Sequence, residues 1–177
     1  MTIQDNKYPV SLRAVHWLMA AGFALLFVTG PIMVDLAKDD PLRGTLMNLH
    51  KSIGVLALVF VGLRIYFRRR ASALPELPSG FEHWERELAH YAHRFLYVLM
   101  LVVPLSGWAV SDLHGRPVKL FGLVLPKLFP TVEGIGATPG FVHTVMAYAA
   151  LAVIAFHLAG VLKHRYLDRQ CVLKRMM

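Results

Sequence analysis

Four apolar segments, each long enough to cross a lipid bilayer, limit what this chain can fold into. About 20 residues of α-helix cross a hydrocarbon core about 30 Å thick, and a helix satisfies its backbone hydrogen bonds without water. We therefore predict an all-α integral membrane four-helix bundle, with residues 1–177 forming a single domain. The expected helices cover approximately residues 12–34, 46–69, 86–110 and 141–165.

The composition supports a membrane protein and argues against several soluble classes. Charged residues make up 17% of the chain, against about 25% in a typical soluble domain. The net charge of +8 comes from basic residues at the ends of the apolar segments, so we expect no nucleic-acid partner. The lone cysteine, Cys171, excludes an intramolecular disulfide and a cysteine-based metal cluster, and we expect an unspecialised surface thiol.

The lysines and arginines predict how the bundle is oriented. Thirteen of the 19 lie in the N-terminal tail, the second connection and the C-terminal tail. The remaining six lie in or beside the first and third connections. Because lysine and arginine accumulate on the cytoplasmic side, we predict that both termini are cytoplasmic and that the first and third connections lie outside.

The connections are less regular than the spans. Residues 111–140 are rich in glycine and proline but also apolar, and this length is unusual for a structureless loop. We predict a lid on the outer surface that contains a short interfacial helix. Residues 84–94 are expected to form an amphipathic start to the third span. No internal repeat is apparent.

Two histidines, His143 and His157, lie fourteen residues apart in the last apolar segment. Fourteen residues are almost four helical turns, so both side chains leave one face, about 21 Å apart along the axis. One is therefore expected near each edge of the bilayer. Ionisable side chains inside a membrane helix are costly and usually functional.

Two further histidines match these depths. With the predicted topology, His16 lies near the cytoplasmic edge with His157, and His50 lies near the outer edge with His143. Facing histidines in a helical bundle can hold a haem through one axial ligand on each side. Two haem sites are one interpretation of this pattern. A proton relay and a non-haem metal site through the same histidines are its rivals.

Short motifs along nearly the whole chain carry a resemblance to a known family. They are Arg13-Ala14-Val15-His16-Trp17-Leu18, Leu49-His50-Lys51-Ser52-Ile53-Gly54, Pro104-Leu105-Ser106-Gly107-Trp108, Gly115-Arg116-Pro117-Val118 and Leu162-Lys163-His164-Arg165-Tyr166. In this order and spacing they resemble the bacterial cytochrome b561 family, which is related to the cytochrome b subunits of hydrogenases and formate dehydrogenases.

The resemblance implies two b haems. It implies that His16 and His157 ligate the iron of the cytoplasmic-side haem, and that His50 and His143 ligate the iron of the periplasmic-side haem. It further implies a multi-pass protein of the bacterial inner membrane that contacts lipid and carries electrons between a donor and the quinone pool, with ubiquinone as a possible substrate. No catalytic side chain is expected, because the cofactor would carry the redox chemistry.

Three other functions stay open at this point. A superoxide oxidase would pass electrons from superoxide to ubiquinone, and the basic residues Arg116, Lys119 and Lys127 would then steer the anion. A membrane anchor subunit would pass electrons for a larger dehydrogenase or hydrogenase. A histidine-based transporter would have no redox role. The direction of electron flow is not determined by these motifs.

Other polar residues near the span ends have candidate roles. His90 is the best alternative ligand by position, since it shares a helical face with Arg94. Haem propionates need cationic donors, and Arg64 on the cytoplasmic side and Lys51 on the outer side are candidates. Arg64 follows His50 by fourteen residues, so we expect it on the same face at the opposite depth.

Overall fold

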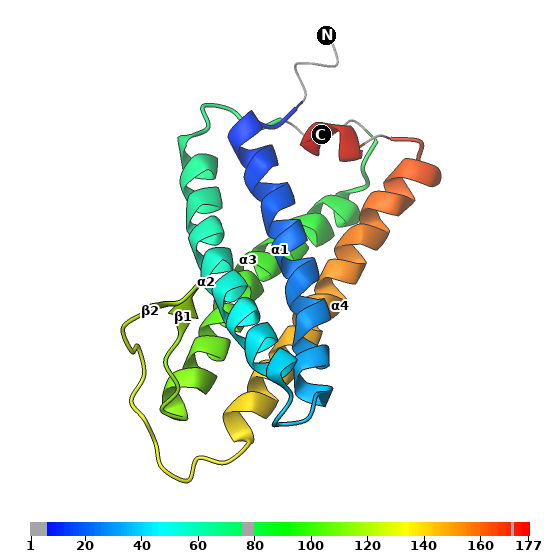
Figure 1. Cartoon of the computed structure of the whole chain (residues 1–177). Helices are drawn as coiled ribbons and strands as arrows, with labels where there is room; N and C mark the ends of the chain where they lie inside the picture. The colour runs from blue at the N-terminus through cyan, green and yellow to red at the C-terminus, as the bar shows by residue number, and fades with distance from the viewer. Residues whose placement is uncertain (1–6, 76–79, 171) are drawn as a thin grey trace.

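The computed structural model describes residues 7–75, 80–170 and 172–177, and Cys171 lies outside these ranges. Its four long helices are α1 (Val10–Asp35), α2 (Pro41–Arg70), α3 (His83–Leu113) and α4 (Thr138–Tyr166) (Figure 1). All four are long and apolar enough to cross a membrane, which confirms the predicted four-helix membrane bundle. The two termini lie at one end of the bundle, here called the inner end. The connection between α3 and α4 lies at the opposite, outer end.

Each helix extends past the apolar stretch that predicted it. The α2 helix begins at Pro41, where the Asp40 side chain accepts a hydrogen bond of 2.8 Å from the Leu42 backbone N–H. The α3 helix begins with a capping box between Glu82 and Glu85, in agreement with the predicted helical start before the third span. Hydropathy therefore locates the spans, while capping groups locate their ends.

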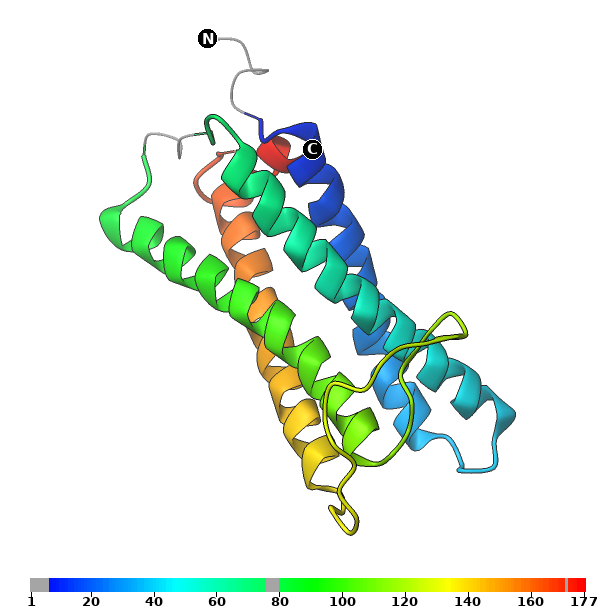
Figure 2. The same ribbon diagram turned by 90° about the vertical axis from the view of Figure 1, so that its left-hand side faces the viewer.

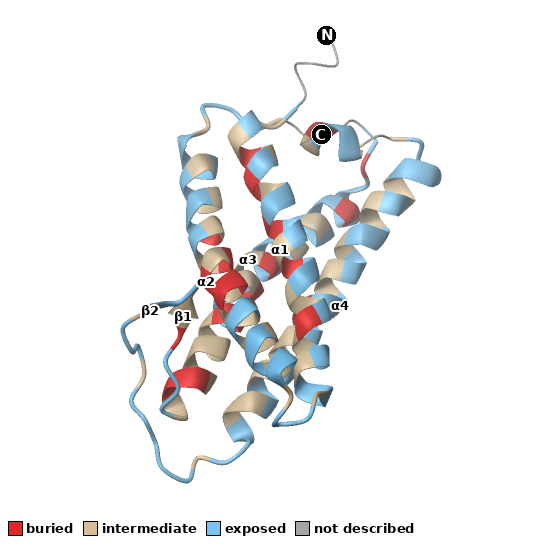
Figure 3. Cartoon of the chain, viewed as in Figure 1, coloured by how far each residue is buried: buried red, intermediate tan, exposed pale blue. Residues whose placement is uncertain are grey.

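The helices pack as two hairpins, α1 with α2 and α3 with α4 (Figure 2). One buried cluster joins α1 and α2, and a second joins α3 and α4. Phe27 of α1 packs against the second cluster and Met100 of α3 against the first, so these two side chains join the hairpins. The outward faces stay apolar and exposed (Figure 3), as lipid contact requires.

The outer connection forms a small β-hairpin instead of the predicted interfacial helix. Strand β1 (Lys119–Leu120) pairs antiparallel with β2 (Leu123–Val124). The two turn residues, Phe121 and Gly122, have positive φ angles of 48° and 99°. This conformation suits a two-residue hairpin turn and cannot continue a right-handed helix. The prediction was wrong because the apolar composition around Gly122 does not reveal the turn at Phe121 and Gly122, and this turn excludes a helix there.

Two buried polar residues hold this connection against the bundle. The Ser52 hydroxyl of α2 accepts from the Phe121 backbone N–H at 2.9 Å, and its single proton is shared between the Asn48 carbonyl at 2.8 Å and the Lys119 carbonyl at 3.1 Å. The Asp112 carboxylate at the end of α3 accepts from the backbone N–H groups of Leu128 and Phe129 at 2.8 and 3.2 Å. The hairpin is therefore fastened to α2, which carries His50, and the segment that follows the hairpin is fastened to the end of α3.

At the inner end, the C-terminal tail folds back onto the start of α1. A 3₁₀ helix, Val172–Met176, brings the Met176 carbonyl to the Trp17 indole N–H at 2.7 Å. The Lys163 ammonium pairs with Glu85 of α3 and with Asp168 beyond the end of α4. Charged contacts thus tie three segments together at this end.

Candidate functional site

The outer histidine pair faces across the bundle. His50 of α2 and His143 of α4 have ring centroids 6.4 Å apart, with their planes at 87°. Both rings line one pocket, whose cavity volume is about 80 Å³. The pocket wall is otherwise mainly apolar, with Lys51 as its one charged residue among those described. Partly buried imidazoles in such a wall are candidates for metal ligation.

A threonine on the neighbouring helix determines which nitrogen of His50 is free. The Thr29 hydroxyl donates to the Leu25 carbonyl at 2.7 Å and lies 3.0 Å from His50 Nδ1. Because a hydroxyl has one proton, Thr29 accepts the second bond from the His50 Nδ1–H. The unprotonated Nε2 of His50 is then available as a ligand, the arrangement usual for metal-binding histidines.

The same arrangement braces His143 from α3. The Ser106 hydroxyl donates to the Val103 carbonyl at 2.7 Å and lies 2.8 Å from His143 Nδ1. We therefore assign the Nδ1–H tautomer to His143 as well, with its Nε2 free. Two hydroxyls on two different helices thus leave the Nε2 atom of each imidazole free to bind a metal.

A glycine next to each hydroxyl lets the imidazole approach the helix backbone. A Cβ atom on Gly107 would lie 3.1 Å from His143 Cε1, and one on Gly30 would lie 3.4 Å from His50 Cε1. The distance at Gly107 is shorter than ordinary carbon–carbon contacts, whereas the distance at Gly30 is at their lower limit. The pairs Thr29-Gly30 and Ser106-Gly107 therefore cradle the outer histidines.

The inner histidine group contains three imidazoles from three helices. His157 of α4 lies in ring contact with His93 of α3, with centroids 5.2 Å apart. His16 of α1 is within electrostatic range of both. Arg64 of α2 interacts electrostatically with His16 and His157, as its fourteen-residue spacing from His50 predicts. All four helices thus contribute a polar side chain to the inner group.

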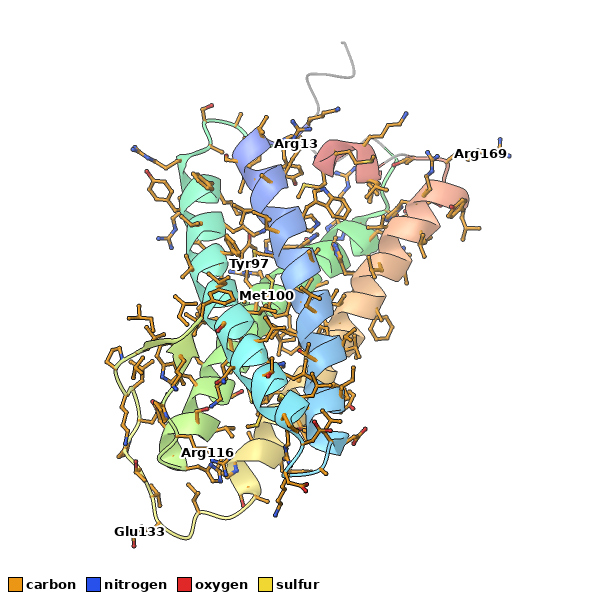
Figure 4. The ribbon with its side chains drawn as sticks, in the orientation of Figure 1. Arg13, Tyr97, Met100, Arg116, Glu133 and Arg169 are labelled. Carbon is orange, nitrogen blue, oxygen red and sulfur yellow. The ribbon has the colours of Figure 1, made fainter. Side chains whose placement is uncertain are left out.

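Arg64 is itself held in place. Its Nε donates to the Tyr97 hydroxyl at 3.1 Å, and its Nη1 donates to the Leu12 carbonyl at 3.2 Å. Figure 4 labels Tyr97 at mid-height of the bundle, between Arg13 at the inner end and Arg116 at the outer end. The guanidinium is therefore a fixed charge inside the bundle.

The structure brings together the histidines that were paired by depth, but it also changes one assignment. His93, rather than His90, lies against His157, while the His90 ring contacts Tyr91. Thr29, Ser106, the two cradling glycines and His93 were not found from the sequence. Ser106 and Gly107 belong to one of the motifs that carry the family resemblance, and this motif is the sequence feature that points to them.

A cluster at the inner end has ligand atoms close enough for a metal ion but does not resemble a metal site. Glu85, His164 and Asp168 offer such atoms within 4.8 Å of one another. The Lys163 ammonium bonds both carboxylates, and His164 Nδ1 lies 2.6 Å from Asp168. A resident cation already neutralises this cluster, so we interpret it as an ion-pair network.

The geometry of the outer pair fits a haem iron. If both imidazoles ligated one metal ion through metal–nitrogen bonds of about 2 Å, their ring centroids would lie about 6 Å apart. The observed separation is 6.4 Å, and both Nε2 atoms are unprotonated in the assigned tautomers. The donor set is neutral imidazole, which suits haem iron.

A four-helix membrane bundle with facing imidazoles fits the class of b-type membrane cytochromes. The family model of the prokaryotic cytochrome b561 matches residues 7–177, and the chain belongs to this family. It is therefore a membrane electron-transfer protein that carries b-type haem, with several spans in a bacterial membrane.

Relatives of known sequence match over almost their entire length. Cytochrome b561 homolog 2 of Escherichia coli strain K12 is 30% identical over 177 residues, which cover 99% of this chain and 94% of the relative. The probable superoxide oxidase CybB of Yersinia pestis is 27% identical over 174 residues, 97% of this chain and 96% of the relative. Cytochrome b561 homolog 1 of E. coli strain K12 is 24% identical over 173 residues, 97% of each chain.

Proposed function

We propose that this protein holds two b haems and transfers electrons between a donor and the quinone pool. His50 and His143 would ligate the outer haem iron, and His16 and His157 would ligate the inner one. The observation that carries the proposal is the outer pair, in which each Nδ1–H is bonded to a hydroxyl and the ring centroids are 6.4 Å apart. Haem supplies reversible one-electron chemistry at each site.

The protein side chains around the two sites would bind, orient and tune the cofactor. Thr29 and Ser106 orient the outer ligands and raise their basicity through the Nδ1–H bonds. At the inner site Arg64 is positioned to neutralise a propionate. The Lys51 ammonium, which lines the outer pocket, can do the same at the outer site.

The distribution of basic residues supports one orientation in the membrane. With the lysine-rich and arginine-rich inner end in the cytoplasm, the inner haem would lie on the cytoplasmic side of the bacterial inner membrane and the outer haem on the periplasmic side. Electrons would then cross most of the bilayer through the two sites. Quinone, which is dissolved in the membrane, would be one of the two redox partners.

A superoxide oxidase activity is the second candidate, and one observation favours it. Lys51, which lines the outer histidine pocket, interacts electrostatically with Arg116 and Lys119, and also with the Asp112 carboxylate. A cluster of cations there would attract a small anion such as superoxide and raise its encounter rate. A relative of similar length carries the name of this activity.

Haem analysis of purified protein tests the main proposal. We expect two haems per chain, with low-spin b-type bands after reduction. His50→Ala or His143→Ala should remove the outer haem, and His16→Ala the inner one, so each variant should retain one haem. A colourless wild-type protein would refute the proposal, as would loss of both haems from a folded single variant.

Rapid mixing with superoxide tests the second candidate. The oxidised protein should be reduced by superoxide and reoxidised by ubiquinone. Replacing Arg116 and Lys119 by glutamine should slow the reduction, and added salt should slow the wild type more than the variant. Lys127→Gln is the matched control, because Lys127 bonds Thr131 at 2.9 Å instead of approaching Lys51. If the reduction rate changed neither with these substitutions nor with salt, the argument for this activity would fail.

A further inference from the structure

The two helical hairpins repeat one histidine-bracing unit. In the first hairpin Thr29-Gly30 of α1 cradles His50 of α2. In the second, Ser106-Gly107 of α3 cradles His143 of α4. A buried alanine follows each of these histidines by seven residues, Ala57 in the first hairpin and Ala150 in the second. The hairpins therefore correspond residue by residue at the outer site, although the sequence shows no obvious repeat.

This correspondence extends to the inner site. His16 lies thirteen residues before Thr29, and His93 lies thirteen residues before Ser106. His93 thus occupies on α3 the position that His16 occupies on α1. By the same count, Arg64 corresponds to His157, since each follows its outer histidine by fourteen residues. At the outer site, the two corresponding histidines His50 and His143 form a pair. At the inner site, His93 is the α3 residue that corresponds to the proposed ligand His16 of α1.

The His93 side chain is also prepared as a ligand. Its Nδ1 lies 2.6 Å from the Ala89 carbonyl, and a carbonyl can only accept, so Nδ1 carries the proton. The free Nε2 is then in the same chemical state as in His50 and His143. The ring contacts His157, with centroids 5.2 Å apart and planes at 76°, and it interacts electrostatically with His16.

We propose that His93 is a reserve axial ligand of the inner haem, which takes the place of His157 when His157 does not bind the iron. The inference rests on the proposed function, because it assumes a haem at the inner site. The opposite ligand would stay His16. The outer site has no such reserve, since among the described residues only His50 and His143 are in ring contact there.

Three variants of the full-length protein, purified with haem, test this proposal. His157→Ala should retain the inner haem in a six-coordinate low-spin form, with a shifted midpoint potential because the ligand has changed. His93→Ala should retain the inner haem with its wild-type low-spin spectrum. The double variant His93→Ala/His157→Ala should lose the inner haem only. Haem content, electron paramagnetic resonance and redox titration supply the readouts.

The outer site supplies the matched control. His143→Ala should lose the outer haem completely, because among the described residues no third imidazole is in ring contact with this pair. Loss of the inner haem from His157→Ala alone, or a five-coordinate high-spin signal in that variant, would overturn the proposal and leave the two-haem function intact. Loss from His93→Ala with an unchanged His157→Ala protein would also overturn it, because His93 would then be the resident ligand. Wild-type protein without haem would instead refute the function itself.

Discussion

The outer and inner histidine groups are built from corresponding positions on the same four helices, yet their surroundings differ. At the outer site each imidazole is held by a hydroxyl and lies against a glycine. At the inner site the neighbours are a third imidazole and a guanidinium. The neutral hydroxyls and close packing of the outer site favour one orientation of each imidazole. The inner site, with three histidines and an arginine, has more than one imidazole that can bind a metal. Under the proposed function, one bundle would hold two haems in surroundings that differ in charge and in packing.

The largest effect is expected from filling the outer cradle. Gly107→Val places branched carbon atoms where even a Cβ would lie 3.1 Å from His143 Cε1, so His143 must leave its position. We expect the outer haem to be lost and the inner haem to be retained, as measured by haem content and reduced spectra. Gly62→Val is the control, because nothing lies within 4 Å of a Cβ there. Full outer haem in Gly107→Val would show that the cradle does not position the ligand.

A smaller effect is expected from removing the braces while keeping the ligands. Thr29→Val leaves the His50 Nδ1–H unpaired, which costs about 1–3 kcal/mol. Ser106→Ala removes the hydroxyl partner of His143 and leaves the Val103 carbonyl as its remaining acceptor. Loss of such a partner typically lowers metal affinity by about 10- to 100-fold. Redox titration should show a more positive outer-haem potential and an unchanged inner-haem potential. Equal shifts at both haems would contradict the separation of the two sites.

The fastening of the outer hairpin should matter less. Ser52→Ala removes both bonds that join α2 to the turn, and the exposed Phe121 N–H should exchange its hydrogen faster. Haem content should stay at the wild-type level. Thr45→Ala is a suitable control, because that hydroxyl bonds only the Pro41 carbonyl of its own helix. Unchanged exchange at residues 118–125 would mean that other contacts hold the hairpin.

The smallest effect concerns the inner end and pH. The hydrogen bond from Lys163 lowers the pKa of the Asp168 carboxyl below its ordinary value of 3.8. A depressed carboxyl pKa contributes stability that is fully present above the unfolded value and is lost as the pH falls through the folded value. Docking of the tail should therefore persist down to about pH 4 and weaken below it, as followed by hydrogen exchange of residues 167–177. Asp168→Asn should abolish this pH dependence.

The sequence predicted the parts of this molecule that depend on composition and spacing along one helix. The length of the apolar segments predicted the four spans, and the position of each histidine within its span predicted the facing outer pair. The braces were not predictable in this way, because Thr29 and His50 are on different helices and their contact depends on how those helices rotate against each other. For the same reason His90 was preferred to His93, since only packing shows which face of α3 turns inward.

The outer connection shows a second limit. Its apolar residues indicated surface contact, but its structure depends on one two-residue turn in which Phe121 adopts a positive φ angle. A bulky side chain is uncommon in that conformation, so nothing in the residue type predicts it. Ser52, two residues after His50, then holds the turn through bonds that no pattern along the chain reveals.

Both α4 histidines lie on a single continuous helix. The number of residues between them therefore determines whether both side chains can face the bundle interior. Each added or deleted residue between His143 and His157 would turn one side chain by about 100° relative to the other and shift it by about 1.5 Å along the axis. One of the two would then face lipid. Insertions and deletions in residues 144–156 should therefore be far less tolerated than substitutions there, whatever the hydrophobicity of the new residue.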